Sequence, residues 1–95
     1  PWQPGVLALI GMTAAAGQKV GKPVGVCGEA AADPYLACVL VGLGVTSLSM
    51  AVAAIPAVGA QLARVTMDQC KAAAEAVLKA DTDTAAREAA RAALS

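Results

Sequence analysis

The sequence predicts an α/β fold of parallel βα units whose sheet is only part of a larger one. Two short apolar runs bounded by glycine, over residues 23–27 and 45–52, are separated and followed by helical patterns. Alternation of strands and helices is typical of parallel sheets with helical crossovers. A parallel sheet needs cover on both faces, and two strands alone do not make a stable one. We therefore expect a portion of a sheet.

The first predicted helix covers residues 4–20. Pro4 suits the first turn of a helix, and Gly21 ends the pattern just after a lysine. The apolar positions that recur at helical spacing are Val6, Ile10, Ala14 and Gly17. The run that follows, 23–27, is short and valine-rich, which is typical of a parallel strand buried on both faces.

The middle of the chain predicts one more helix and a second strand. Asp33 followed by Pro34 is typical of an N-cap and the first helical residue, so a helix is expected over 33–41. Two glycines, Gly42 and Gly44, end this helix and lead into the second strand, 45–52.

Three helices are predicted after the second strand. The first covers 55–65 and is entered through a proline, and the second covers 67–79. Thr66 and Gln69 have the spacing of a capping box at the start of that second helix. A polar hinge over 81–84 then leads to an alanine-rich helix over 84–94. We accordingly expect a main domain over 1–80 and a helical tail over 81–95.

Composition excludes several classes of function. The formal net charge is zero, so no basic surface is indicated for nucleic acid or anionic lipid. The absence of histidine removes the commonest metal ligand and the commonest general base. Three cysteines, Cys27, Cys38 and Cys70, have no CxxC spacing, which favours reduced thiols in a cytoplasmic protein over a disulfide framework or a zinc site.

Residues 34–63 carry no charge and would be long enough to suggest a membrane span. Glycines and prolines interrupt the run, however, at Gly42, Gly44, Pro56 and Gly59. No stretch of spanning length keeps one helical face through these breaks. Each break coincides with a predicted boundary of a βα unit, so we expect no membrane insertion.

Cys27 is the candidate site residue. It ends the first strand between Gly25 and Gly28, and the carboxyl ends of parallel strands carry the chemistry in α/β proteins. The alternative is a small buried hydrophobe, which is common for free cysteine. An ordinary thiol, with a pKa of about 8.5, is protonated at pH 7. Since no lysine or arginine adjoins Cys27, a proton donor is favoured over a nucleophile.

The other residues near this edge have plainer interpretations. Glu29 is expected to accept hydrogen bonds from nearby backbone amides, with a role at the rim as the alternative. Ser49 and Met50 follow the second strand and are expected to pack at the rim. Cys38 and Cys70 fall inside helices and are expected in the core.

Several quoted segments together resemble one enzyme family. "KPVGVCGEAAADP" is followed by "LVGLGVTSLSM" and "AAIPAV", with "QPGVLALIGMT" upstream and "VTMDQCKAAAEAVL" downstream. This series resembles the C-terminal end of the phosphoenolpyruvate-protein phosphotransferases, Enzyme I of the sugar phosphotransferase system. The likeness covers nearly the whole chain and is weakest beyond Ala80.

The resemblance implies a fold, a reaction and partners. The fold would be the C-terminal portion of a (β/α)8 TIM barrel, two βα units plus C-terminal helices, that binds phosphoenolpyruvate and Mg²⁺. A histidine on another domain, absent here, would take the phosphoryl group and pass it to the carrier protein HPr. Cys27 would protonate the enolate to give pyruvate. A cytoplasmic homodimer is implied as well.

Much of this machinery has no match in the chain. The resemblance places the magnesium ligands and an arginine clamp earlier in the barrel, and Arg64, Arg87 and Arg91 lie on helices after the last strand. We therefore expect the isolated chain to be inactive, and to self-associate or repack as an incomplete, helix-rich barrel. Pro1 is interpreted as an internal cut in a longer protein. Departures at Ala51, Val52 and Gly59 from the family pattern concern surface contacts.

Two alternatives remain open at this point. Pyruvate phosphate dikinase and phosphoenolpyruvate synthase are similar around the CGE element, but "SLSM" and the two further helices favour the phosphotransferase. A non-catalytic structural or interaction module with the same fold is the second alternative. The presence of Cys27 between its glycines argues mildly against that module.

Overall fold

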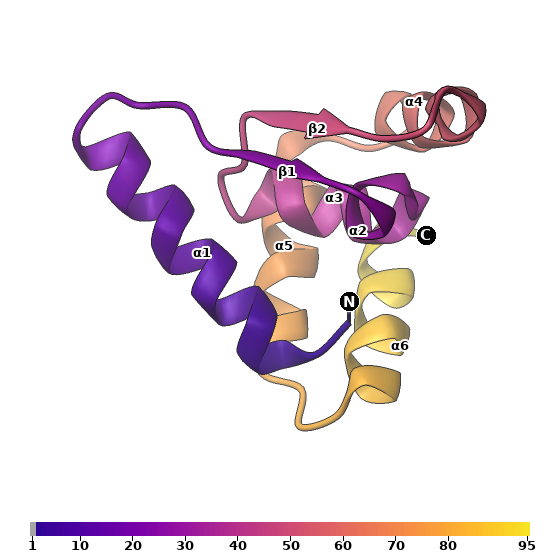
Figure 1. Cartoon of the computed structure of the whole chain (residues 1–95). Helices are drawn as coiled ribbons and strands as arrows, with labels where there is room; N and C mark the ends of the chain where they lie inside the picture. Colours follow the sequence, from indigo (N-terminus) through magenta and orange to yellow (C-terminus); the bar gives the residue numbers. More distant parts are fainter. Residues whose placement is uncertain (1) are drawn as a thin grey trace.

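The computed structural model describes residues 2–95 and shows a small parallel sheet among helices (Figure 1). This arrangement confirms the predicted helix-rich α/β class. The elements in chain order are α1 (Pro4–Lys19), β1 (Gly25–Cys27), α2 (Glu29–Ala32), α3 (Pro34–Gly42), β2 (Ser47–Ser49), the 3-10 helix η1 (Val52–Ala54), α4 (Ile55–Ala63), α5 (Met67–Leu78) and α6 (Asp83–Leu94).

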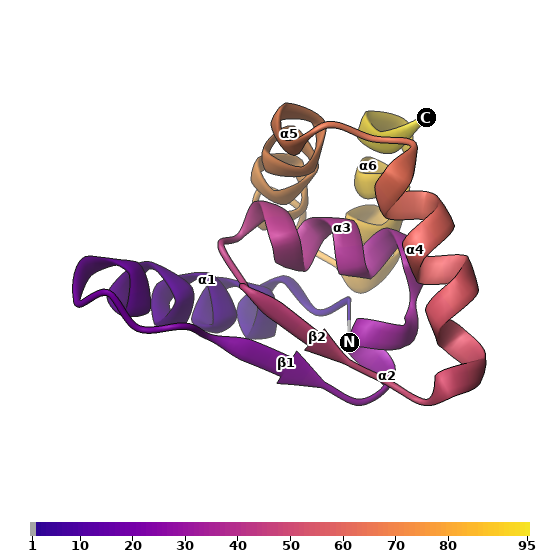
Figure 2. The ribbon, with the colours of Figure 1, turned by 90° about the horizontal axis from the view of Figure 1, so that it is seen from above.

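The two strands run parallel, with Val26 opposite Leu48 and Cys27 opposite Ser49. Val26 and Leu48 are half-buried against the core, whereas Cys27 and Ser49 are exposed. Because side chains alternate between the two faces of a strand, one face of the sheet rests on helices and the other is open. Figures 1 and 2 show α3, α5 and α6 on the same side of the strands. The prediction that both faces are buried is therefore wrong for this chain.

Both strands are shorter at their starts than the predicted 23–27 and 45–52. The hydroxyl of Thr46 accepts a hydrogen bond from the Val24 amide at 2.9 Å and donates one to the Val24 carbonyl at 3.0 Å. The Thr46 amide also donates to that carbonyl at 2.8 Å. The Thr46 side chain thus makes hydrogen bonds to Val24 that backbone groups would make in a regular parallel sheet.

The second strand also ends earlier than predicted. The Gly28 amide donates to the Ser49 carbonyl at 3.1 Å, and β1 stops at this point. Within residues 2–95, β1 is the one strand that pairs with β2, so the ladder cannot continue past it. Val52, predicted as strand, belongs instead to η1 and is 81% exposed.

The first helix ends within one residue of its predicted end, but it buries a different stripe. Val6 is exposed and Ile10 is only half-buried, whereas Leu7, Ala14 and Gly17 are buried. Leu7 has no exposed surface at all. A buried leucine side chain contributes about 1.5–3 kcal/mol, which favours turning this residue toward the core.

The predicted helix caps at Asp33 and Thr66 are confirmed. The Asp33 carboxylate accepts from the amides of Tyr35 and Leu36 at 3.0 and 3.2 Å. Thr66 Oγ1 accepts from the Gln69 amide at 3.1 Å, and Gln69 Oε1 accepts from the Thr66 amide at 2.9 Å. These bonds satisfy amides that lack partners at the start of a helix.

The hinge before the last helix is shorter than the predicted 81–84. Thr82 caps α6, because its hydroxyl accepts from the Ala85 amide at 3.1 Å. The helix therefore begins at Asp83. The short helix α2 was not predicted, and it occupies the turn between β1 and α3.

The charge-free run is explained largely by α3, which is the central helix of the core. Helices α2, α4, α5 and α6 pack around it, and a helix enclosed in this way is apolar on all sides. Its fully buried residues are Leu36, Ala37, Cys38, Val39 and Leu40. Of the helices within residues 2–95, none is at once long and apolar enough to cross a membrane.

The isolated chain is expected to self-associate. Its Cα radius of gyration is 12.1 Å, close to the roughly 12 Å of a compact domain of this length. It nevertheless exposes several large apolar side chains, with Met12 68% exposed. Together with the open sheet face, such surfaces promote association. Sedimentation velocity at tens of micromolar should show dimers or larger species, and a single monomeric species would contradict this expectation.

Candidate active site at the carboxyl edge of the strands

Cys27 lies at the carboxyl end of β1 and is exposed, so the alternative of a buried structural thiol does not hold in this chain. Ser49, at the carboxyl end of β2, is its neighbour in the sheet and is exposed as well. Because Val26 and Leu48 pack against the core, the exposed side chains of Cys27 and Ser49 belong to the opposite face of the sheet. The chain therefore presents a thiol and a hydroxyl at one edge of an open sheet face.

The chain turns sharply just after the cysteine. Gly28 has a φ of 96° and a ψ of −157°, a conformation that side-chain-bearing residues rarely adopt. Glu29 then opens α2 and is exposed at its first turn. No hydrogen bond is recorded for this carboxylate within the described residues, so its predicted role as an acceptor for backbone amides is not observed there.

The residues beside Cys27 on the open face of the sheet have small side chains or none. A Cβ added at Gly25 would lie 2.6 Å from Ser47 Oγ, which is below any real contact distance. Gly25 therefore allows Ser47 to occupy the open face. Met50, predicted at the rim, is half-buried and lines a cavity of about 430 Å³ between β2 and α4.

The other two cysteines form a buried pair, as the sequence predicted for each of them. Cys38 on α3 and Cys70 on α5 have 0% and 2% of their surfaces exposed. Burial raises the pKa of the Cys38 thiol to about 11, and the neighbouring Cys70 adds to this rise. Burial also raises the pKa of Cys70. Both groups are thus neutral packing residues at pH 7.

Cys38 is expected to make folding sensitive to alkaline pH. A thiol whose pKa is higher in the folded than in the unfolded protein adds stability below the unfolded value, and this contribution disappears as the pH rises through the folded value. For Cys38 the window runs from 9.0 to about 11. The full loss would be at most about 2–3 kcal/mol. Denaturant titrations should show a shallower alkaline decline for Cys38→Ala, and equal declines would contradict the assignment.

The three arginines lie on or at the end of helices that follow the last strand, as the sequence predicted. The Arg64 guanidinium, beyond the end of α4, donates to Gln61 Oε1. Arg87 and Arg91, both on α6, lie over aromatic rings. Within residues 2–95, no group of three or more His, Cys, Asp or Glu side chains is placed to hold a metal ion.

Sequence reasoning missed the role of Trp2. Its indole Nε1–H donates to Asp33 Oδ2 at 3.1 Å, and its surface is only 2% exposed. Arg87 lies over the ring, with Cζ at 5.9 Å from the centroid. The available signal was the single tryptophan in a chain with one other aromatic residue, because a large ring in an alanine-rich chain has few places to be buried.

The chain matches the family described as PEP-utilising enzyme, PEP-binding domain, over residues 1–67. The match covers more than half of the chain and includes β1, Cys27 and β2. The chain therefore belongs to this family of phosphoenolpyruvate-utilising enzymes.

The curated relatives include phosphoenolpyruvate-protein phosphotransferases. That of Streptomyces coelicolor is 58% identical over 95 residues, which is 100% of this chain and 17% of the relative. That of Haloferax volcanii is 44% identical over 80 residues, or 84% of this chain and 14% of the relative. A multiphosphoryl transfer protein of Xanthomonas campestris is 42% identical over 79 residues, which is 83% of this chain and 9% of the relative.

These relatives confirm the resemblance inferred from the motifs around Cys27. The chain spans less than a fifth of the length of each of them.

Proposed function

We propose that the chain is the C-terminal part of a phosphoenolpyruvate-protein phosphotransferase. The observation that carries the proposal is an exposed thiol, Cys27, at the carboxyl edge of parallel strands in a chain of the PEP-utilising family. In the longer protein, a histidine outside this chain takes the phosphoryl group of phosphoenolpyruvate. The phosphohistidine then phosphorylates the carrier protein HPr in sugar uptake.

Cys27 is the proposed proton donor of this reaction. Transfer of the phosphoryl group to histidine breaks the bond between phosphorus and the enol oxygen and leaves pyruvate enolate. The Cys27 S–H bond then breaks, its proton forms the new C–H bond at C3, and pyruvate is released. The remaining thiolate takes a proton from solvent. Small neighbours suit this role, since a donor must come within hydrogen-bond reach of its acceptor.

The open face of the sheet supports a barrel in the longer protein. Cys27 and Ser49 are exposed on that face, while Val26 and Leu48 on the other face meet the helices. In a (β/α)8 barrel, helices cover the outside of the strands and the inner face points toward the barrel axis. The two βα units here are proposed as the last quarter of such a barrel, with Cys27 at its mouth.

The remaining components are assigned to the longer protein. Magnesium and the residues that bind the phosphate are proposed to belong to segments outside this chain, and no step above runs through the metal. A cytoplasmic homodimer is proposed for the complete enzyme. The isolated chain is expected to form no pyruvate, because phosphoryl transfer depends on positioning and charge neutralisation by groups that it lacks.

The test is to purify the longer protein that contains this chain and supply it with phosphoenolpyruvate, Mg²⁺ and HPr. We expect pyruvate release together with phosphorylated HPr, and neither product from the 95-residue chain alone. Pyruvate release coupled instead to ATP formation would favour a dikinase. Absence of any phosphoenolpyruvate turnover would overturn the proposal and favour a non-catalytic module.

A further inference from the structure

We propose that Trp2 and Asp33 are positioning residues for the Cys27 thiol. This inference rests on the proposed role of Cys27 as the proton donor. It concerns the segment between the end of β1 and the start of α3, which carries the cysteine at one end and Asp33 at the other.

The Cys27 end of this segment is held to the sheet. Cys27 is in register with Ser49, and the Gly28 amide donates to the Ser49 carbonyl at 3.1 Å. Gly28 then turns the chain through its positive φ into the single-turn helix α2. Such a short helix has little stability of its own, so its position depends on the packing of its buried Ala31 and on what holds its two ends.

Asp33 holds the other end with both carboxylate oxygens. Oδ1 accepts from the Tyr35 and Leu36 amides and caps α3. Oδ2 accepts from the Trp2 indole at 3.1 Å, across a separation of 31 residues. The cap ties Asp33 to its own helix, whereas the indole ties it to the segment that precedes α1.

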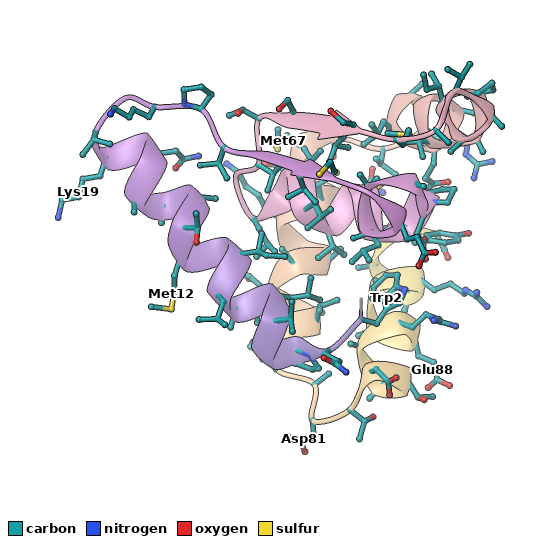
Figure 3. The ribbon with its side chains drawn as sticks, in the orientation of Figure 1. Trp2, Met12, Lys19, Met67, Asp81 and Glu88 are labelled. Atoms are coloured by element: carbon teal, nitrogen blue, oxygen red, sulfur yellow. The ribbon has the colours of Figure 1, made fainter. Side chains whose placement is uncertain are left out.

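Trp2 is in turn held by the C-terminal helix. The ring is 2% exposed, and the guanidinium of Arg87 on α6 lies over it at 5.9 Å. Four residues further along α6, Arg91 lies over the ring of Tyr35 at 5.6 Å. Figure 3 shows Trp2 beside α6. Helix α6 thus holds both aromatic side chains that adjoin Asp33.

The bond between Trp2 and Asp33 is expected to affect catalysis, because it helps to hold the segment between β1 and α3 in place. Loss of the indole bond leaves the cap of α3 intact but frees Asp33 from Trp2, so α2 and the Cys27 backbone gain freedom. A proton donor is sensitive to such shifts, since a displacement of about 1 Å can slow a reaction about 100-fold. The phosphoenolpyruvate affinity should change little, because the phosphate-binding groups are assigned outside this chain.

Two variants of the longer protein separate the indole bond from the cap. Asp33→Asn keeps an oxygen to cap α3 but can turn only an amide N–H₂ toward the indole N–H, which cannot accept. Trp2→Phe keeps a ring beneath Arg87 and removes the donor. Asp68→Asn makes the same change of charge in the first turn of α5, where Asp68 is exposed, and serves as the matched control.

The assay is pyruvate formation, measured in water and in deuterium oxide over a range of phosphoenolpyruvate concentrations. We expect Asp33→Asn and Trp2→Phe each to lower kcat about 10- to 100-fold with little change in KM. The solvent isotope effect should rise, because proton transfer becomes rate-limiting. Asp68→Asn should change neither quantity.

Other outcomes overturn the positioning role. An unchanged isotope effect beside a lower kcat would mean that the variants only reduce the amount of folded enzyme. An unchanged kcat would mean that the contact does not position Cys27. If Cys27→Ala itself left kcat unchanged, the proposed function of Cys27 would fail first, so the two failures are distinguishable. Trp2→Phe keeps the test valid should Asp33→Asn fold poorly.

Discussion

Gly42→Ala is expected to lower the free energy of unfolding by about 3 kcal/mol, because the added methyl group overpacks the contact between two helices. Gly42 is the last residue of α3 and lies against the backbone of α5. A Cβ there would be 2.0 Å from the Cys70 carbonyl oxygen, 2.4 Å from its carbonyl carbon and 2.9 Å from the Lys71 amide nitrogen. These are backbone atoms, so no side-chain rotation relieves the clash.

The clash would separate the two helices at the centre of the core. Helices α3 and α5 contact each other closely, and the buried Cys38 and Cys70 lie on these same helices. Alanine favours a helix interior over glycine by about 1 kcal/mol, which offsets only part of the cost.

Gly59→Ala is the matched control for this experiment. Gly59 lies within α4, and a Cβ there would meet nothing within 4 Å. Its replacement is expected to raise stability by up to about 1 kcal/mol through helix propensity alone. Thermal denaturation followed by circular dichroism should therefore move the two variants in opposite directions. Equal midpoints for Gly42→Ala and the parent chain would contradict the close contact of α3 with α5.

Cys27→Ala is expected to slow pyruvate formation by the longer protein about 10²- to 10⁴-fold, the range that a general acid contributes. The thiol is exposed at the carboxyl edge of β1, and no histidine in the chain can replace it as donor. Alanine removes the proton without adding volume. We therefore expect kcat to fall while binding of phosphoenolpyruvate persists.

Cys70→Ala provides the control for loss of a thiol as such. Cys70 is 2% exposed and packs between helices, so its replacement should affect stability and leave the rate per folded molecule unchanged. Calorimetric titration with phosphoenolpyruvate would show whether Cys27→Ala still binds substrate. A Cys27→Ala enzyme with the parent kcat would show that another group donates the proton.

Local signals in the sequence predicted the helix boundaries well. Asp33–Pro34 and Thr66 with Gln69 specify caps through side chains that bond amides two or three residues away, and such bonds need no distant partner. The burial of Cys38 and Cys70 was likewise predicted, since each lies within an apolar helical stretch. The carboxyl-edge position of Cys27 followed from its place at the end of a short apolar run.

Features that depend on distant partners were predicted poorly. The strand over 45–52 was too long because its end depends on where β1 stops, which the local pattern does not contain. The prediction that both strand faces are buried was wrong. A high valine content indicates a strand, whereas the burial of that strand depends on which elements surround it. The buried stripe of α1 shifted toward Leu7 for the same reason.

By itself, the sequence determined the α/β class, the capped helices, the family and the cysteine at the strand end, because each depends on residues close together in the chain. Only the tertiary structure decided that Cys27 lies on an open sheet face and that Trp2 contacts both Asp33 and the distant Arg87 of α6. Such a contact forms because burying a large ring and pairing its N–H both stabilise the fold. Which residue accepts the indole N–H, and which lies over the ring, depends on how α3 and α6 pack together. No local sequence pattern encodes that packing.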